Sequence, residues 1–207
     1  MTAIRQASDT SARSRGRPRE FDMDQALDRA VRVFSKRGYH GASISDLTTE
    51  MGLTQGSLYK AFKDKQSLFL AAFEHYRAAR ARKLQGFVGE TGNGLARLRG
   101  VLEFYVASSQ GAAGRQGCLV VASATELSAF ERDVARHITD ALSRNESLLM
   151  GLIELGQADG SIAAHVDSAA AARMLLCLAQ GMRVVGKTGR SRQDMQAVVD
   201  VALKALG

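Results

Sequence analysis

Apolar residues recur at helical spacing along almost the whole chain, and this periodicity restricts the fold more than any other feature of the sequence. Leu27, Ala30, Val31 and Phe34 lie at positions i, i+3, i+4 and i+7, so a helix would carry all four on one face. No stretch of useful length alternates apolar and polar residues as a half-buried strand requires. The single proline, Pro18, precedes these patterns. The sequence therefore predicts an all-α protein.

Composition and charge exclude several classes of protein. The 207 residues are 45% hydrophobic and 24% charged, close to the average for globular domains. Charged or polar residues interrupt every apolar stretch before the roughly 18 residues of a membrane span, and no apolar run follows the early positive charges as in a signal peptide. Two cysteines are too few for a disulfide-stapled secreted scaffold. We expect a cytoplasmic protein of one large or two small domains that contacts no membrane.

Residues 1–19 form a basic segment with five arginines and one acid, Asp9, among small and polar residues. Ordering such a chain costs about 1–2 kcal/mol per residue, and it has too few apolar groups to offset that cost. Contact with a polyanion would order it, whereas a solvated terminus without function is the alternative. We expect residues 1–18 to be a flexible basic arm.

Two short helices joined by a tight turn are predicted within residues 43–62. Ser43 suits the N-cap of the first helix, with Asp46 in its first turn, and Gly52 ends it. Thr54 caps the second. In this arrangement one helix braces the other against the DNA major groove. Apolar residues at positions 47, 51, 53, 58 and 62 would hold the pair together and onto the preceding helix.

The outward face of the second short helix is polar and lacks acids, as phosphates and base edges require. Gly56 lets the backbone approach DNA closely. Lys63 and Lys65 extend a positive rim. Two short capped helices without any DNA contact would show the same pattern, so the residues alone leave that alternative open. The outward residues are Thr54, Gln55, Ser57, Tyr59 and Lys60.

The segment from about Arg17 to Tyr76 resembles the N-terminal domain of TetR-family transcriptional regulators. The resemblance rests on AVRVF at 30–34, GYHGAS at 38–43, ISDL at 44–47 and GSLYKAFKDK at 56–65. It covers about the first third of the chain, and the later helices match the family only in length and helical character. It implies a homodimeric repressor whose ligand, held in the C-terminal domain, changes the spacing of two DNA-binding heads. Such a repressor is released from a palindromic double-stranded operator by a small-molecule effector.

The resemblance also implies roles for single residues in binding the DNA backbone. Ser43 and Ser45 match family residues near the start of the second helix that touch phosphates. Lys65 matches a lysine that clamps a phosphate from the start of the fourth helix. Tyr59 matches an aromatic residue that contacts the backbone and a thymine methyl group.

Other positions match residues that contact bases. Thr54, Gln55 and Gly56 match the leading, base-facing positions of the recognition helix, where family sequences vary most. Lys60 occupies a position often filled by His or Tyr in the family. Arg15, Arg17 and Arg19 resemble the basic arm that some members place in the minor groove.

The chain is expected to divide into the arm, a helix-turn-helix DNA-binding domain at 19–65 and a helical ligand-binding and dimerisation domain at 66–207. A long helix at about 64–87 links the two halves. Glycine-containing breaks such as 111–114 and 159–160 separate the later segments. Further helices are predicted near 93–109, 118–126, 128–156, 166–186 and 191–206.

The last two predicted helices have the composition of a dimer interface. The penultimate helix is rich in small residues, from Ala169 to Ala172 and again at Ala179 and Gly181. The last offers a run of apolar residues that includes Val198 and Val201. Two copies would form a four-helix bundle. Packing within one subunit is the alternative.

A ligand cavity in the C-terminal half is implied by the resemblance alone. Its expected lining is mostly apolar, with Tyr105, Ser123, Thr125 and Glu126 among few polar candidates. A lining with few polar groups favours an apolar or aromatic effector.

Cys118 is a second candidate for the effector site. It begins a predicted helix after a glycine-rich break, where the helix dipole favours a thiolate. Some TetR-like repressors that respond to electrophiles carry a reactive cysteine in a similar Gly-Cys-Leu setting. A small buried hydrophobe is the commoner fate of a free cysteine. Cys177, between leucines, is predicted to lie in the core.

Other chemistry finds little support in the sequence. Residues 181–188 match the pattern of a nucleotide-binding phosphate loop, but they follow a helical segment instead of a strand. The four histidines lie on separate segments, without the spacing of metal ligands. The sequence also has no Gly-x-Ser-x-Gly motif, the nucleophile elbow of many hydrolases. We therefore expect no metal, no cofactor and no enzymatic activity. A helical small-molecule carrier or scaffold that does not bind DNA is the alternative function.

Overall fold

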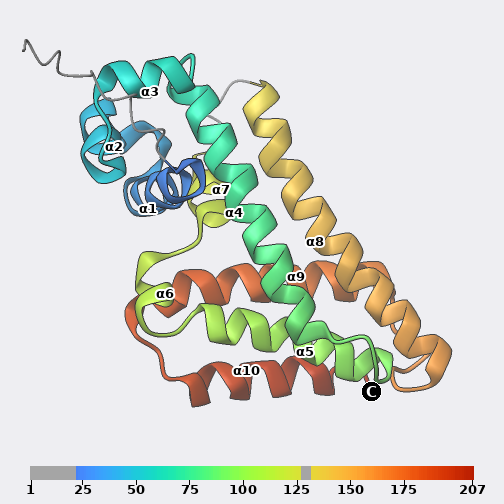
Figure 1. Ribbon diagram of the computed structural model, residues 1–207. Coiled ribbons are helices and arrows are strands. Elements are labelled where there is room, and N and C mark those ends of the chain that lie inside the picture. Colours follow the sequence, from blue (N-terminus) through green and yellow to red (C-terminus); the bar gives the residue numbers. More distant parts are fainter. Residues whose placement is uncertain (1–21, 127–131) are drawn as a thin grey trace, which may run out of the picture.

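The computed structural model describes residues 22–126 and 132–207, and every regular element in these ranges is helical (Figure 1). The predicted all-α class is confirmed for this part of the chain. The predicted arm, with Arg15 and Arg17, lies outside the described residues. The elements are α1 (Met23–Gly41), α2 (Ile44–Met51), α3 (Gln55–Ala61), α4 (Lys65–Val88), α5 (Gly94–Ser108), α6 (Gly111–Gln116), α7 (Leu119–Thr125), α8 (Arg132–Asp159), α9 (Ser168–Val185), the 3-10 turn η2 (Gly186–Thr188) and α10 (Arg192–Lys204).

The short helices begin and end at the predicted capping residues. The Ser43 hydroxyl accepts the N–H of Asp46 at 3.0 Å, and the Asp46 carboxylate accepts the N–H of Ser43 at 3.1 Å. Gly52 ends α2 with φ 69°, a left-handed conformation that glycine adopts without strain. The Thr54 hydroxyl caps α3 by accepting the N–H of Ser57 at 3.1 Å. These local bonds fix where α2 and α3 begin and where α2 ends.

The helices form two layers joined by two long helices. In Figure 1, α1, α2 and α3 lie together at one end, and α5, α9 and α10 are stacked at the other. The long helices α4 and α8 run from the first layer to the second. A movement of the second layer can therefore reach the first through either long helix.

Each layer has its own hydrophobic core. The first core joins α1–α4 to α7 and the start of α8, and Phe34 meets Phe69 edge to face within it at 5.2 Å between ring centroids. The second core joins α5, the rest of α8, α9 and α10 around Leu102 and Ile153. Each fully buried large side chain contributes about 1.5–3 kcal/mol. Because α7 and α8 contribute to the first core, the first layer is anchored by elements of the C-terminal half.

One segment that was predicted to separate two helices is itself helical. Residues 111–114, expected to form a glycine-rich break, belong to α6. The backbone of Gly114 lies so close to the Ser109 carbonyl that an added side chain would overlap it. The glycines therefore serve close packing as well as chain reversal.

The prediction for Cys177 is wrong, because this cysteine is exposed on α9. Ala172, Leu175 and Ala179 form the buried face of the helix, and Cys177 lies with Met174 on the opposite face. The leucines on either side of Cys177 are its neighbours in sequence, but successive side chains of a helix point in different directions, so these leucines do not bury it.

The segment that matches a phosphate loop lies at the end of α9 and in η2, in the helical context expected from its sequence. Within the described residues, Ser168–Thr188 is the one helical stretch whose length and hydropathy also fit a membrane span. Its apolar face packs against α8 and α5. We therefore assign it to the protein core.

Candidate DNA-binding surface and effector cavity

The outward face of α3 carries the polar residues predicted from the sequence. Gln55, Gly56 and Lys60 are exposed, and Tyr59 is exposed to 44%. Leu58, on the opposite face of the helix, is fully buried in the first core. The helix is thus held rigidly from behind while its polar face remains accessible.

Thr54 and Ser57 have a structural role besides their predicted one. Thr54 caps α3, and its hydroxyl lies 2.9 Å from the Ser57 hydroxyl. Ser43 is engaged in the same way with Asp46 at the start of α2, and Ser45 is exposed beside it. These hydroxyl groups remain at the protein surface, but part of their hydrogen-bonding capacity holds the helix ends.

Lys65 is the first residue of α4, and its ammonium group lies 4.5 Å from the centroid of the Tyr39 ring. Burial lowers the pKa of Lys65, while the nearby Glu126 carboxylate acts in the opposite direction. The aromatic contact holds the cation at the edge of the helix-turn-helix.

Glu126, one of the expected ligand-lining residues, instead contacts the end of α1. Its carboxylate accepts the N–H groups of Tyr39 at 3.0 Å and His40 at 3.2 Å. Both N–H groups follow Gly38, where φ is 72° and the helix is interrupted. We call this contact the Glu126 clamp. It joins the C-terminal end of α7 to the first layer.

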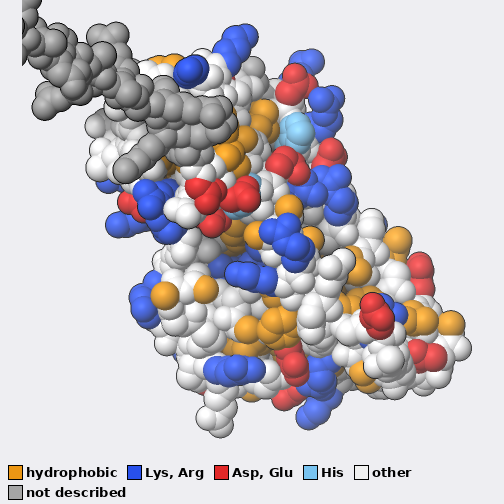
Figure 2. All heavy atoms as spheres, in the orientation of Figure 1, with side chains coloured by type: hydrophobic (Ala, Val, Ile, Leu, Met, Phe, Trp, Pro, Cys, Tyr) orange, Lys and Arg blue, Asp and Glu red, His pale blue; other side chains and the backbone are white. Residues whose placement is uncertain are grey.

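A cavity of about 310 Å³ lies between the two layers, bounded by α1, α4, α5, α6 and α9. Figure 2 shows Lys and Arg side chains gathered where α4 passes from one layer to the other. Apolar groups from Val31, Ala79 and Phe104 share the lining with these cations. The charged and polar lining residues are Asp28, Arg32, Tyr76, Arg80, Lys83, Ser108, Gln116 and Arg183.

Cys118 lies immediately behind this cavity, next to its lining residue Gly117. The thiol is buried, with 3% exposed, and accepts a hydrogen bond from the Tyr76 hydroxyl at 3.4 Å. Burial acts to raise the pKa of Cys118, but Arg80, the Tyr76 hydrogen bond and Arg183 together hold it below its ordinary value. The surroundings therefore favour a thiolate at a position that the bulk solvent does not reach directly.

Tyr105 and Ser123, the other two predicted ligand-binding residues, differ in their surroundings: Tyr105 lines a cavity and Ser123 does not. Tyr105 is buried beside the Arg80 guanidinium, which lies 5.4 Å from its ring centroid, and it lines a second cavity of about 210 Å³. Ser123 is buried and donates a hydrogen bond to the Leu119 carbonyl at 2.7 Å within α7. The structure brings Tyr105 and Cys118 together around Arg80 and leaves Ser123 as a helix-internal residue.

Tyr76, Arg80 and Arg183 neighbour Cys118 but were not predicted as site residues from the sequence. A signal for Arg183 was present, because it is the charged residue on the otherwise apolar buried face of α9. Arg80 gave no such signal, since it lies in a run of basic residues on α4 that is typical of a solvated face.

A capped helix pair with a polar outward face, joined through long helices to a domain with a polar cavity, defines a helix-turn-helix DNA-binding protein with a sensory domain. Comparison with known proteins identifies the family. The model described as "Bacterial regulatory proteins, tetR family" matches residues 26–72, and that described as "Tetracyclin repressor-like, C-terminal domain" matches residues 94–202. The chain belongs to the TetR family and is a transcriptional regulator.

Individual relatives match over nearly the whole chain. The HTH-type transcriptional repressor ComR of Escherichia coli (strain K12) is 31% identical over 197 residues, which span 93% of this chain and 92% of ComR. The uncharacterized regulator YezE of Bacillus subtilis (strain 168) is 26% identical over 92% of this chain and 99% of its own. A cysteine mutant of the TetR family transcriptional regulator CifR, complexed with 26bp double-strand operator DNA, superposes with a TM-score of 0.82 at 32% identity, over 93% of this chain and 100% of that chain.

Proposed function

We propose that the protein is a homodimeric repressor that leaves a palindromic operator when a small-molecule effector reaches its C-terminal domain. The observation that carries this proposal is the rigid α3, whose buried Leu58 anchors a polar, acid-free outward face. The superposition on a cysteine mutant of CifR complexed with operator DNA supports it. We infer that the chain acts in the cytoplasm and has no catalytic activity, as expected for a regulator.

The proposed DNA contacts divide into three groups. Thr54, Gln55 and Gly56 face the bases, Arg15 and Arg17 reach the minor groove, and the remaining residues contact the backbone and set affinity. The proposed backbone and groove contacts are Arg15, Arg17, Ser43, Ser45, Ser57, Tyr59, Lys60 and Lys65.

We propose that Cys118 is the effector-sensing residue. Its thiolate, favoured by Arg80, Tyr76 and Arg183, would add to the C=C bond of an unsaturated electrophile: a C–S bond forms, the π bond breaks and the neighbouring carbon takes a proton from water. The added group would displace the start of α7. The Glu126 clamp at the other end of α7 would pass this displacement to α1. That the CifR complexes with DNA are cysteine mutants is consistent with a role for cysteine in that relative.

We propose that α9 and α10 form the dimer interface. An exposed apolar stripe runs along both helices and includes Met174, Val184, Val185, Val198 and Val201. Large exposed apolar residues grouped on one face mark an interaction surface. Cys177 lies on the same side of α9 as Met174 and would be covered in the dimer.

A mobility-shift experiment with the DNA upstream of the protein's own gene tests the proposed function. We expect a shifted complex whose affinity falls steeply with salt, as phosphate contacts require. An electrophile such as N-ethylmaleimide should release the DNA from the wild type but not from Cys118→Ser. No complex even at low salt would contradict DNA binding and favour a carrier or scaffold.

A further inference from the structure

Arg183 is a buried cation whose hydrogen-bonding capacity is only partly used. Its side chain is 2% exposed and lines the cavity between the layers. Nη2 donates to the Gly117 carbonyl at 2.6 Å and lies 3.4 Å from the Ala113 carbonyl. Nε and Nη1 have no partner among the described residues. A buried charge left unpaired costs several kcal/mol, so these donors call for an acceptor.

Arg80 supplies a second cation to the same cavity. Its guanidinium lies 4.5 Å from the Phe104 ring centroid and 5.6 Å from that of Tyr76. Within residues 22–126 and 132–207, no ion pair joins Arg80 or Arg183 to a carboxylate. The aromatic rings fix the position of the guanidinium, and no carboxylate of the described residues neutralises its positive charge.

The acids near the cavity do not neutralise these cations. Asp28 is the acid in the described lining, and its carboxylate lies 2.9 Å from Nε2 of His75. Arg32, also in the lining, is already paired with Glu50 at 3.0 Å. Lys83 adds a further positive charge. The lining therefore carries more positive than negative charge.

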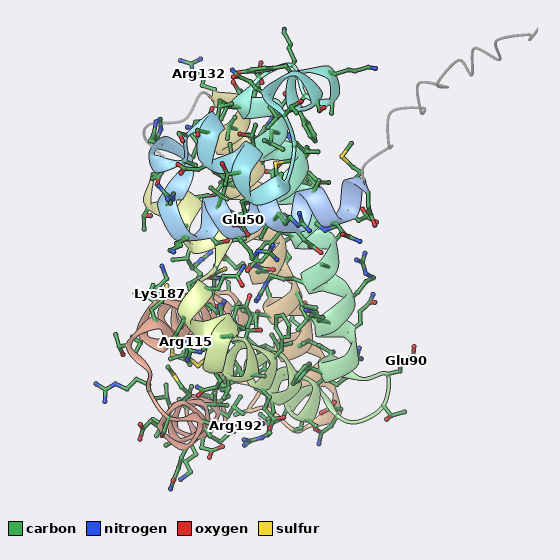
Figure 3. The ribbon with its side chains drawn as sticks, turned by 60° about the vertical axis from the view of Figure 1, so that its left-hand side comes forward. Glu50, Glu90, Arg115, Arg132, Lys187 and Arg192 are labelled. Carbon is green, nitrogen blue, oxygen red and sulfur yellow. The ribbon has the colours of Figure 1, made fainter. Side chains whose placement is uncertain are left out.

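Cys118 accounts for at most one compensating negative charge. Its sulfur accepts the Tyr76 hydroxyl and lies behind the cavity wall, so it does not supply acceptors for both arginines. Figure 3 shows α6 and η2, with the labelled Arg115 and Lys187, on the side of the second layer that faces α1. The cations of the cavity lining itself come from α1, α4 and α9, so an anion entering the cavity would meet donors already in place.

We propose that this cavity binds a small organic carboxylate, whose oxygens accept hydrogen bonds from Arg80 and Arg183. The apolar body of the ligand packs on Val31, Ala79 and Phe104. A volume of about 310 Å³ lies at the small end of ligand sites, so a single ring or a short chain fits. A guanidinium binds a planar carboxylate with two parallel hydrogen bonds. This inference rests on the proposed function, since it names the chemical class of a ligand that the effector-binding domain holds reversibly. The carboxylate is distinct from the electrophile that would react with Cys118.

Isothermal titration of the full-length protein without DNA tests the inference. The probes are benzoate and hexanoate, their neutral amides benzamide and hexanamide, and inorganic phosphate. We expect each carboxylate to bind at least about tenfold more tightly than its amide, because hydrogen bonds to charged groups are the stronger ones. Phosphate, which has no apolar body, should neither bind comparably nor displace the carboxylates.

Variants on the same helices make the test specific. Arg80→Gln and Arg183→Gln should each weaken carboxylate binding at least about tenfold and leave amide binding unchanged. Arg82→Gln is the matched control, because Arg82 is exposed on α4 and lies outside the cavity lining. Arg183→Lys, which keeps the charge, covers the case in which Arg183→Gln does not fold.

Three outcomes would overturn the inference: equal affinity for carboxylate and amide, binding of phosphate alone, or equal losses in Arg80→Gln and Arg82→Gln. A mobility shift without any probe separates this failure from that of the proposed function. Operator binding that persists while no carboxylate binds rejects only the carboxylate site. Absence of operator binding rejects the repressor itself.

Discussion

Gln55 is an outward residue at the start of α3 whose amide group suits recognition of adenine. It is exposed, and it immediately follows the capping residue Thr54, which fixes the start of the helix. A glutamine amide can make two hydrogen bonds to an adenine edge, worth roughly 1–3 kcal/mol of discrimination. We therefore expect Gln55→Ala to relax the preference at one base pair in each operator half. Site selection from random DNA measures this, and an unchanged profile would rule out the contact.

Lys65 is proposed to contact a DNA phosphate, a contact that contributes to affinity for every DNA sequence alike. We expect Lys65→Ala to weaken binding to every DNA sequence and to lower the dependence of log affinity on log salt by about one unit, because one phosphate contact is lost. Mobility shifts at several salt concentrations provide the slope. Arg82→Ala is a suitable control, since Arg82 is an exposed cation on α4 outside the helix-turn-helix and the proposed dimer interface. An equal loss of affinity at all salt concentrations would contradict the phosphate contact.

The hydrogen bond from Tyr76 should influence how the reactivity of Cys118 depends on pH. Tyr76 donates to the sulfur and contributes to holding the pKa of Cys118 below its ordinary value. The thiolate, which is the nucleophile, forms as the pH rises through this pKa. Tyr76→Phe should therefore move the midpoint of the rate of alkylation by iodoacetamide to higher pH.

This measurement needs a background without the exposed Cys177, so Cys177→Ser is combined with each protein. The midpoint is compared instead of the absolute rate, because burial of the thiol slows alkylation in both proteins. An identical midpoint with and without the Tyr76 hydroxyl would show that this bond does not stabilise the thiolate.

At the scale of elements, α7 connects the two parts of the proposed mechanism. It begins directly after Cys118 and ends directly before Glu126, whose carboxylate accepts the N–H groups of Tyr39 and His40. A displacement of the start of this two-turn helix is carried to its far end, because a short helix moves as a rigid unit. The clamp is therefore the point where a change at Cys118 would reach α1.

We expect Glu126→Ala to lower the stability of the protein by about 1–3 kcal/mol, since two backbone N–H groups lose a charged acceptor. Glu126→Gln should retain most of the stability, because the amide oxygen still accepts both hydrogen bonds. Urea unfolding compares the three proteins. Equal stability of wild type and Glu126→Ala would show that the clamp contributes nothing.

The elements differ in how well the sequence predicts them. Helices with side-chain caps, such as α2 after Ser43 and α3 after Thr54, were predicted at the correct start because the capping signal is local. α6 was missed because Gln110 makes no side-chain cap and the glycines of the helix resemble a loop. Its stability comes from packing against Ser109 and Gly186, which the sequence alone does not reveal.

The residues of the candidate sites also differ in how well the sequence predicts them. The outward residues of α3 were predictable because one periodic helix separates buried from exposed positions. The surroundings of Cys118 were not, since Arg80 and Arg183 lie far from it and from each other in sequence, and only the packing of α7 against α4 and α9 brings them together. Expectations for the DNA contacts remain predictions until the residues are changed.

At the scale of the whole molecule, the proposed repression depends on the distance between two copies of α3. Two heads on successive major grooves must be separated by roughly 34–36 Å, or a multiple of it. In each chain the layer that carries α3 is joined to the layer of α9 and α10 by α4 and α8 (Figure 1). Pairing through α9 and α10 would therefore set this distance, and a shift of α4 or α7 would change it.

The proposed dimer interface makes the last prediction. Val201 on α10 is 69% exposed, more than the other large exposed apolar residues of the described chain. In a two-fold interface Val201→Glu would place two carboxylates in the contact, where burial of a charge is costly. We expect the variant to be monomeric in sedimentation experiments and to lose operator affinity, because each head then binds its half-site alone. Met23→Glu, which adds the same charge at an exposed apolar position of α1, should remain dimeric. A dimeric Val201→Glu that binds the operator normally would place the interface elsewhere.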